Sequence, residues 1–221
     1  MNKNIFPLLV IVLLASAGCQ RTDVQYYENG NKKSVFRKKG DQFHGESVWY
    51  YQNEQPKLKV QYKDGVIHGT SINFYYNGNE EQLENYVEGR RNGKASKWYE
   101  NGKLKEEANY KNDTLHGAYQ VYYPDGQIQI DGQFDNGLYD GKWVWWNRTG
   151  LKVGEADFDK GKGKQVSWYL NGNKKTELPY LDNQIHGVAK FYKENGKLEK
   201  SMLYEQGEVI KTIPADDKSN L

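Results

Sequence analysis

Apolar and polar residues alternate along this chain in short runs separated by turn residues, and the whole pattern repeats. The turn residues form three columns, of which the first recurs every 24 residues with one interval of 22. A tight turn needs positive φ, which Gly adopts without steric cost and Asn or Asp tolerates. The first column is Gly30, Glu54, Gly78, Gly102, Gly126, Gly150, Gly172 and Gly196; the second is Gly40, Gly65, Gly89, Asp113, Gly137, Gly161, Asn183 and Gly207; the third is Gly45, Gly69, Gly93, Gly117, Gly141, Gly163 and Gly187.

These columns divide the chain into eight units of two short strands each, some 16 strands in all. Consecutive strands without helical intervals pair as an antiparallel meander, and no segment has the 3.6-residue apolar period of a helix. The sequence therefore predicts an all-β, solenoid-like fold, an elongated and twisted antiparallel meander of about eight 24-residue β-hairpin repeats over residues 26–213. Gly78, Gly102, Gly117, Gly126 and Gly187 are its expected structural turns, and Gly161-Lys162-Gly163 is expected to shorten one loop by two residues.

Aromatic residues occupy three further columns along the strands. One ring stands three residues before the second turn in every unit except the first, which has Arg37. Another stands five residues after the third glycine, as Phe74 and Trp98 do. The next position faces the opposite side of the strand and is Tyr in five units: Tyr51, Tyr75, Tyr99, Tyr123 and Tyr169. Because Tyr is favoured in protein contacts, this tyrosine row is the predicted binding surface. The alternative is that the curl of the sheet and cross-strand ring packing cover both faces.

Residues 1–18 have the composition of a processing segment. Lys3 precedes an apolar run of 13 residues from Ile5 to Ala17, too short to span a bilayer, and Cys19 follows. The segment resembles a bacterial lipoprotein signal peptide, although Ser16 stands where that family usually has Leu. The resemblance implies that Cys19 is acylated, becomes the N-terminus and is followed by a polar tether, together residues 19–25. The alternative is an ordinary secretory signal that is cleaved nearby.

The charges are nearly balanced, with 31 Lys and Arg against 29 Asp and Glu mixed through every unit. A nucleic-acid partner would require a basic face, so none is expected. Cys19 is the single cysteine, which leaves the chain after it without a disulfide or a free thiol. Residues 214–221 are polar and charged and are expected to form a flexible tail.

Candidate catalytic and metal-binding residues do not converge in the sequence. The four histidines share one repeat column, whose equivalent positions two strands apart lie about 9.6 Å from each other, too far for nitrogens that bind one zinc at about 2 Å. A polar turn position explains this column: His44, His68, His116 and His186, with Asn92, Asp140 and Lys162 in the other units. Neither Glu106-Glu107 nor Asp216-Asp217 has a partner for acid–base catalysis, and no phosphate-loop or nucleophile motif occurs. We therefore expect no catalytic residue, no metal and no cofactor.

The repeated unit resembles the bacterial variant of the MORN repeat, on the residues Tyr99-Glu100-Asn101-Gly102 and Leu115-His116-Gly117 and on their repetition over roughly residues 26–210. Proteins with this variant are grouped as YwqK-type antitoxins of toxin–antitoxin systems, and MORN arrays serve as scaffolds for protein contact or membrane attachment. The resemblance implies an antitoxin- or immunity-like protein, whose target, a toxin in that case, lies outside the inner membrane.

Together these observations predict a non-enzymatic, membrane-anchored scaffold of the cell envelope that faces the periplasm or exterior and binds an unidentified protein. Gln20, rather than Asp, after Cys19 favours the outer membrane where the source has two membranes. The alternative is an envelope scaffold that binds glycan or lipid headgroups through its aromatic and Lys-rich rows.

Overall fold

The computed structural model describes residues 20–215, which form one open sheet of 20 antiparallel strands without a helix in that part of the chain. Residues 1–19 and 216–221, which include Cys19, lie outside the described residues. The strands are β1 (Gln20–Tyr26), β2 (Lys32–Lys39), β3 (Gln42–Phe43), β4 (Gly45–Tyr50), β5 (Pro56–Lys63), β6 (Val66–Phe74), β7 (Glu80–Val87), β8 (Arg90–Arg91), β9 (Gly93–Trp98), β10 (Leu104–Lys111), β11 (Thr114–Tyr122), β12 (Ile128–Asp135), β13 (Leu138–Trp146), β14 (Lys152–Asp159), β15 (Lys162–Trp168), β16 (Lys174–Leu181), β17 (Gln184–Ile185), β18 (Gly187–Tyr192), β19 (Leu198–Glu205) and β20 (Glu208–Pro214).

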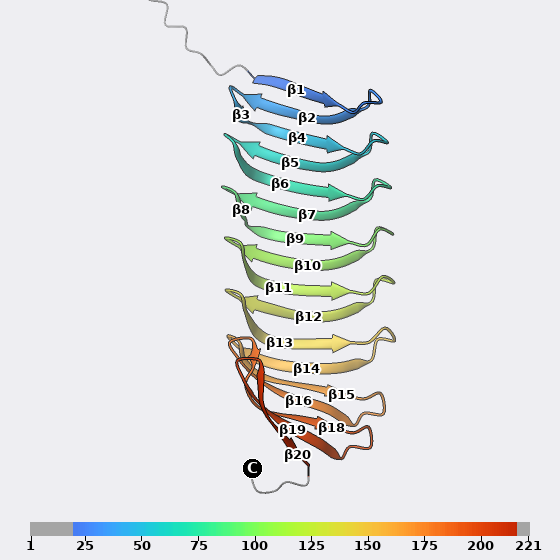
Figure 1. The fold of residues 1–221 in the computed structure, drawn as a ribbon, viewed down its shortest axis with the longest axis vertical. Helices are drawn as coiled ribbons and strands as arrows, with labels where there is room; N and C mark the ends of the chain where they lie inside the picture. Colours follow the sequence, from blue (N-terminus) through green and yellow to red (C-terminus); the bar gives the residue numbers. More distant parts are fainter. Residues whose placement is uncertain (1–19, 216–221) are drawn as a thin grey trace, which may run out of the picture.

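Apart from the two-residue strands β3, β8 and β17, each strand pairs with its successor in the chain, as the predicted meander requires. The hairpins are stacked one after another along the long axis of the molecule (Figure 1). The two-residue strands β3, β8 and β17 are continued by β4, β9 and β18 on the same partners. The elongated all-β meander is thus confirmed, and one strand, β1, was not predicted. It occupies the expected tether and pairs with β2 from Gln20–Lys39 to Tyr26–Lys32.

Turns of two kinds alternate between the two sides of the sheet (Figure 1). On one side, two turn residues both have positive φ, as in Asp64 at 48° and Gly65 at 85°, and the twist of such type I′ turns matches that of the strands. On the other side the loop has three residues: the Gly78 amide donates to the Tyr75 carbonyl at 3.0 Å and the Tyr75 amide to the Asn79 carbonyl at 2.8 Å. Gly78, Gly102 and Gly126 occupy this loop with φ of 88°, 80° and 93°.

The first unit is offset by one residue from the alignment that its glycines suggest. Lys39 pairs with Gln42, so the turn consists of Gly40 and Asp41, and Asp41 rather than Gly40 is equivalent to Gly65. Lys38, not Arg37, consequently takes the position that is aromatic in the other units. Its ammonium lies 5.5 Å from the ring centroid of its partner Phe43.

The interval of 22 residues results from a lost bulge, and the predicted shortening of a loop is wrong. In units with a bulge, pairing jumps at the third glycine, as from Gln133–Asp140 to Asp131–Val144. β14 and β15 instead pair without a jump from Asp159–Lys162 to Gly154–Ser167, and Lys160 and Gly161 keep the ordinary two-residue turn. Gly163 also lacks the positive φ of Gly117 and Gly187, which is 97° in both.

Strand alternation and pairing give the sheet two faces, named here after one residue each. The Ala108 face carries the small buried residues Val60, Ala108 and Ala156, and the ring column that includes Phe158. The Phe74 face carries the ring column that includes Phe74 and Trp98. Because residues 20–215 provide no second layer to cover either face, most side chains in the strands are only half-buried.

The main apolar core lies on the Ala108 face between β11 and β16. Trp143, Ala156 and Phe158 are 3%, 6% and 5% exposed, and Tyr119, Ile130, Phe134, Tyr139, Trp145 and Tyr180 pack against them. We name these nine residues the aromatic cluster. Gly132 makes room for it, because a Cβ at this position would lie 2.2 Å from the Trp143 ring. Asn183 links turns of this region, donating from Nδ2 to the Gly137 carbonyl and accepting from the Tyr139 amide, both at 2.8 Å.

Candidate binding surfaces

The predicted tyrosine row forms a ladder along the side of the sheet with three-residue loops. Each hydroxyl donates to the backbone carbonyl of the residue 23 positions later, in the next hairpin. The distances from Oη to oxygen are 2.7 Å for Tyr51 and Phe74, 2.8 Å for Tyr75 and Trp98, 2.7 Å for Tyr99 and Tyr122, 2.9 Å for Tyr123 and Trp146, and 2.8 Å for Tyr169 and Tyr192. Tyr27, which is not one of the five predicted residues, makes the same bond to the Tyr50 carbonyl at 2.6 Å.

Cationic side chains lie over several rings of this ladder. The Lys57, Lys105 and Lys175 ammonium groups are 5.7, 5.6 and 5.7 Å from the centroids of Tyr51, Tyr99 and Tyr169, within the range of a cation–π interaction. Burial raises the pKa of Tyr51 and of Tyr75, and Glu81 adds to both effects. The row therefore joins neighbouring hairpins within the protein, and a role for it in binding stays a prediction.

Asparagines form a second ladder in the same loops. Asn77 Nδ2 donates to the Glu100 carbonyl at 3.1 Å and Asn101 Nδ2 to the Pro124 carbonyl at 3.2 Å. Their Oδ1 atoms accept the amides of Asn79 and Lys103, both at 3.0 Å. The Asn of the Asn-Gly pair thus stabilises its own loop and bonds to the next one, which explains why it accompanies the turn glycine.

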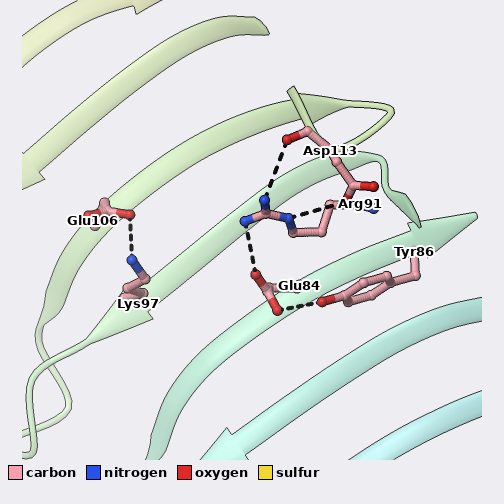
Figure 2. A network of polar contacts seen from close by, with 6 residues as sticks. All are labelled: Glu84, Tyr86, Arg91, Lys97, Glu106 and Asp113. Atoms are coloured by element: carbon pink, nitrogen blue, oxygen red, sulfur yellow. Dashed lines mark hydrogen bonds and ion pairs between the residues drawn. The ribbon is translucent and has the colours of Figure 1, made fainter. Parts of the chain in front are cut away.

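A polar network interrupts the apolar stripe of the Ala108 face between β7 and β11 (Figure 2). Arg91 lies at its centre, with Nη1 3.7 Å from Glu84 Oε1 and Nε 3.4 Å from Asp113 Oδ1. Tyr86 donates its hydroxyl to Glu84 at 2.8 Å. Beside this group, Lys97 Nζ pairs with Glu106 at 2.9 Å. Glu84 and Glu106 are noticeable in the sequence as acids in an otherwise apolar column, but nothing in the sequence indicated that Arg91 pairs with Glu84.

Several groups in or near the network have shifted pKa values. Burial, with the hydrogen bond to Glu84, raises the pKa of Tyr86 to about 12. Burial and the nearby Glu106 also raise the pKa of Tyr119 to about 12. Asp113 has a lowered pKa, chiefly because its carboxylate accepts the Arg91 backbone amide at 2.9 Å. At neutral pH the Tyr86 and Tyr119 phenols are therefore neutral, while Asp113 stays a carboxylate paired with Arg91.

Comparison with known protein families shows four segments that match the model of the MORN repeat variant, residues 43–64, 91–112, 115–136 and 185–206. Four of the units are MORN repeats. Each contains a second strand, a three-residue loop and the following first strand, for example β11 and β12. No curated protein sequence matches the chain. MORN repeats commonly contact membranes or other proteins, and the family is generally a non-catalytic scaffold.

Histidines of this column contact the turn at the far end of their own unit, since His116 and Asn136 both lie in the matched segment 115–136. His68 Nδ1 accepts the Glu88 amide and His116 Nδ1 the Asn136 amide, both at 3.4 Å, while His44 Nδ1 lies 3.2 Å from Asp64 Oδ1. Among residues 20–215, no group of three or more His, Cys, Asp or Glu could hold a metal ion. The same residues contain no helix that is long and apolar enough to cross a membrane.

Glu106 and Glu107, which are adjacent in sequence, point to opposite faces of the sheet. Glu106 pairs with Lys97 on the Ala108 face, and Glu107 forms an ion pair with Lys94 on the Phe74 face. Such an arrangement cannot act as a carboxylate pair, because acid–base catalysis needs both groups within reach of one substrate. Asp216 and Asp217 lie outside the described residues.

Proposed function

We propose that this protein is a membrane-anchored scaffold of the cell envelope that binds another protein through its open sheet. The observation that carries the proposal is the single-layer architecture: residues 20–215 form one sheet with rings on both faces and no covering layer. Only nine hydrophobic residues of this part are buried. Half-buried aromatic side chains held on a rigid surface suit protein recognition, and the MORN repeats in the array are of a kind that commonly makes such contacts.

The anchor in this proposal is a diacyl or triacyl cysteine at Cys19, which places the array outside the inner membrane. An antitoxin- or immunity-like role follows if the partner is a toxin. Growth with a labelled fatty acid tests the anchor, because Cys19 is the single cysteine. The label should appear on the wild type and be absent from Cys19→Ser, whereas equal labelling of both would contradict acylation at this residue.

Affinity capture of the intact lipoprotein from its native envelope tests the scaffold and the surface. Changing the tyrosines themselves would break the ladder, so the test variant is Lys57→Glu/Lys105→Glu/Lys175→Glu, which reverses exposed charges over the rings. The matched control is Lys39→Glu/Lys63→Glu/Lys111→Glu, three exposed lysines next to the two-residue turns on the other side. We expect one stoichiometric protein that is lost from the test variant and kept by the control.

The second candidate is an envelope scaffold for glycan or lipid headgroups, favoured by the row of lysines over aromatic rings. It predicts salt-sensitive association with purified cell wall or anionic vesicles that survives replacement of Cys19. If no protein is captured, or the same set appears with both triple variants, protein recognition by this surface fails and the second candidate takes its place.

A further inference from the structure

The tyrosine ladder has one gap inside the array. Asn147 stands at the position that is Tyr in the hairpins before and after it, Tyr123 and Tyr169. Both of these tyrosines bond to the next hairpin, at the carbonyls of Trp146 and Tyr192. The acceptor that would follow is the Trp168 carbonyl, and among residues 20–215 no side chain donates to it.

Asn147 does not bond to the next hairpin, because its side chain accepts hydrogen bonds within its own loop. Its Oδ1 accepts the amides of Thr149 at 2.9 Å and Leu151 at 3.0 Å. In the other loops this task belongs to the residue two positions after the tyrosine, such as Asn77, and Thr149 takes that place here. The gap also lies next to the unit that has lost its bulge, so two departures from the repeat coincide at β14 and β15.

A pocket of about 300 Å³ occurs beside this gap, and its lining residues are Leu151, Lys152, Val153, Trp168, Tyr169, Leu170 and Gly172. Its volume is at the lower end of the range for binding pockets and suits a single side chain. The Lys152 ammonium lies 5.3 Å from the Trp168 ring centroid at its border. Leu151 is 54% and Leu170 74% exposed, the latter being the most exposed large hydrophobic residue in the described part of the chain.

We propose that this pocket, which we name the gap pocket, binds a tyrosine side chain from an extended segment of the partner protein. The phenol hydroxyl donates to the Trp168 carbonyl, and the ring takes the place that a ladder tyrosine has elsewhere, beside Val153. The phenol is assigned because six hairpins of this protein show it bonded to the equivalent carbonyl. A protein segment is assigned because Leu151 and Leu170 extend the apolar surface beyond the area that one ring covers.

This inference rests on the proposed scaffold function, and its test uses purified full-length lipoprotein so that the two can fail separately. The probes are the blocked peptides acetyl-Gly-Tyr-Gly-amide and acetyl-Gly-Phe-Gly-amide, with p-cresol as a free phenol. The indole N–H signal of Trp168, one of six Trp in the chain, reports binding by NMR titration. We expect the Tyr peptide to shift this signal and to bind about five- to tenfold more tightly than the Phe peptide, as one net hydrogen bond gives.

Two variants locate the binding. Asn147→Tyr/Thr149→Asn rebuilds the ladder sequence, so the chain's own tyrosine should occupy the pocket and abolish peptide binding, whereas Thr149→Asn alone should leave binding intact. Leu170→Ser should weaken the Tyr peptide about tenfold, because it removes one leucine contact. Its matched control is Leu181→Ser, which changes an exposed leucine at the other side of the sheet and should have no effect.

Several results would overturn the inference: no shift of the Trp168 signal, equal affinity for the Tyr and Phe peptides, or undiminished binding in both Asn147→Tyr/Thr149→Asn and Leu170→Ser. Tighter binding of p-cresol than of the Tyr peptide would assign the pocket to a small phenol instead of a protein. Self-association of the wild type that Leu170→Ser abolishes would assign it to a second copy of the chain. Capture of a partner protein without any peptide binding would support the scaffold function and contradict tyrosine binding in the gap pocket.

Discussion

Two neighbouring regions of the Ala108 face use equivalent positions in opposite ways. Between β7 and β10, these positions hold Glu84 and Arg91, whose side chains are 14% and 34% exposed and form an ion pair. Two units later, the equivalents are Gly132 and Tyr139, and the face closes over Trp143, which is 3% exposed. The backbone pairing is the same in both regions. The repeat therefore defines the backbone, and single residues on one face decide whether a region becomes core or stays polar surface.

The family matches do not follow this division, because residues 65–90, which include Glu84, and residues 137–184 both lie outside the four matched segments. Residues 91–112 and 115–136 match the MORN variant, while the units between residues 137 and 184 lie outside the four matches. These units contain most of the aromatic cluster, the lost bulge and the gap pocket.

Removing the centre of the aromatic cluster should have the largest effect. Trp143→Ala is expected to lower the free energy of unfolding by about 3–5 kcal/mol, since it deletes a buried indole from a closed core. Urea denaturation followed by circular dichroism measures this loss. Trp98→Ala, at a half-buried ring of the Phe74 face, should cost clearly less; equal losses would mean that the two faces are equally core-like.

The second largest loss of stability should come from adding a side chain at Gly132, against which the Trp143 ring packs. Gly132→Ala places a Cβ 2.2 Å from the indole ring, and the displacement this forces should cost about 1–3 kcal/mol. Gly154→Ala is the matched control on β14, because the nearest atoms lie at 3.4 Å and the change should stay below about 1 kcal/mol. Thermal unfolding distinguishes the pair, and a Gly132→Ala protein as stable as the wild type would refute the packing of Trp143 over β12.

Variants in the polar region around Arg91 should lose less free energy of unfolding than variants in the aromatic cluster. Arg91→Met leaves Glu84 half-enclosed without its cation and should cost roughly 1–2 kcal/mol, a modest value because Arg91 is 34% exposed and screened by water. Glu84→Leu/Arg91→Met removes both charges and should recover most of that stability. If the double variant is less stable than Arg91→Met, the network contributes more than an apolar filling of the same positions.

The smallest effect should appear at alkaline pH. The pKa of Tyr86 is raised to about 12 in the fold, above its unfolded value near 10, so folding favours the neutral phenol. Its contribution to stability is complete below about pH 10 and is lost as pH rises toward 12. Tyr86→Phe should therefore flatten the fall of the urea midpoint in this range, while Tyr76→Phe, at an exposed loop tyrosine, should follow the wild type.

Much of the fold could be predicted because turns and alternation are local properties. The first two turn columns located the hairpin turns, and the positive φ of their residues needs only neighbouring residues to explain it, whereas the third column marks the bulges. The first unit and the interval of 22 were misread for the same reason: a spacing in sequence does not reveal whether a turn has moved or a bulge has gone. Only the pairing of Lys39 with Gln42 and of Gly154 with Ser167 distinguishes these cases.

The candidate surfaces were predicted less well. The tyrosine row is evident in the sequence, and so is its interruption at Asn147. What each hydroxyl bonds to depends on the stacking of hairpins 23 residues apart, which no local pattern reports. The same holds for Arg91, whose partners Glu84 and Asp113 come from the strands and turns on either side of it.

The sequence by itself determined that this protein is a meander of hairpin repeats with aromatic rows, because steric limits on turns and the two-residue period of strands act over a few residues. The tertiary structure decided which rows became internal ladders and which face closed into a core. It also decided that the ladder is interrupted at Asn147. Those outcomes depend on the stacking register of hairpins that are distant in sequence, and that register is set by the packing of the whole sheet.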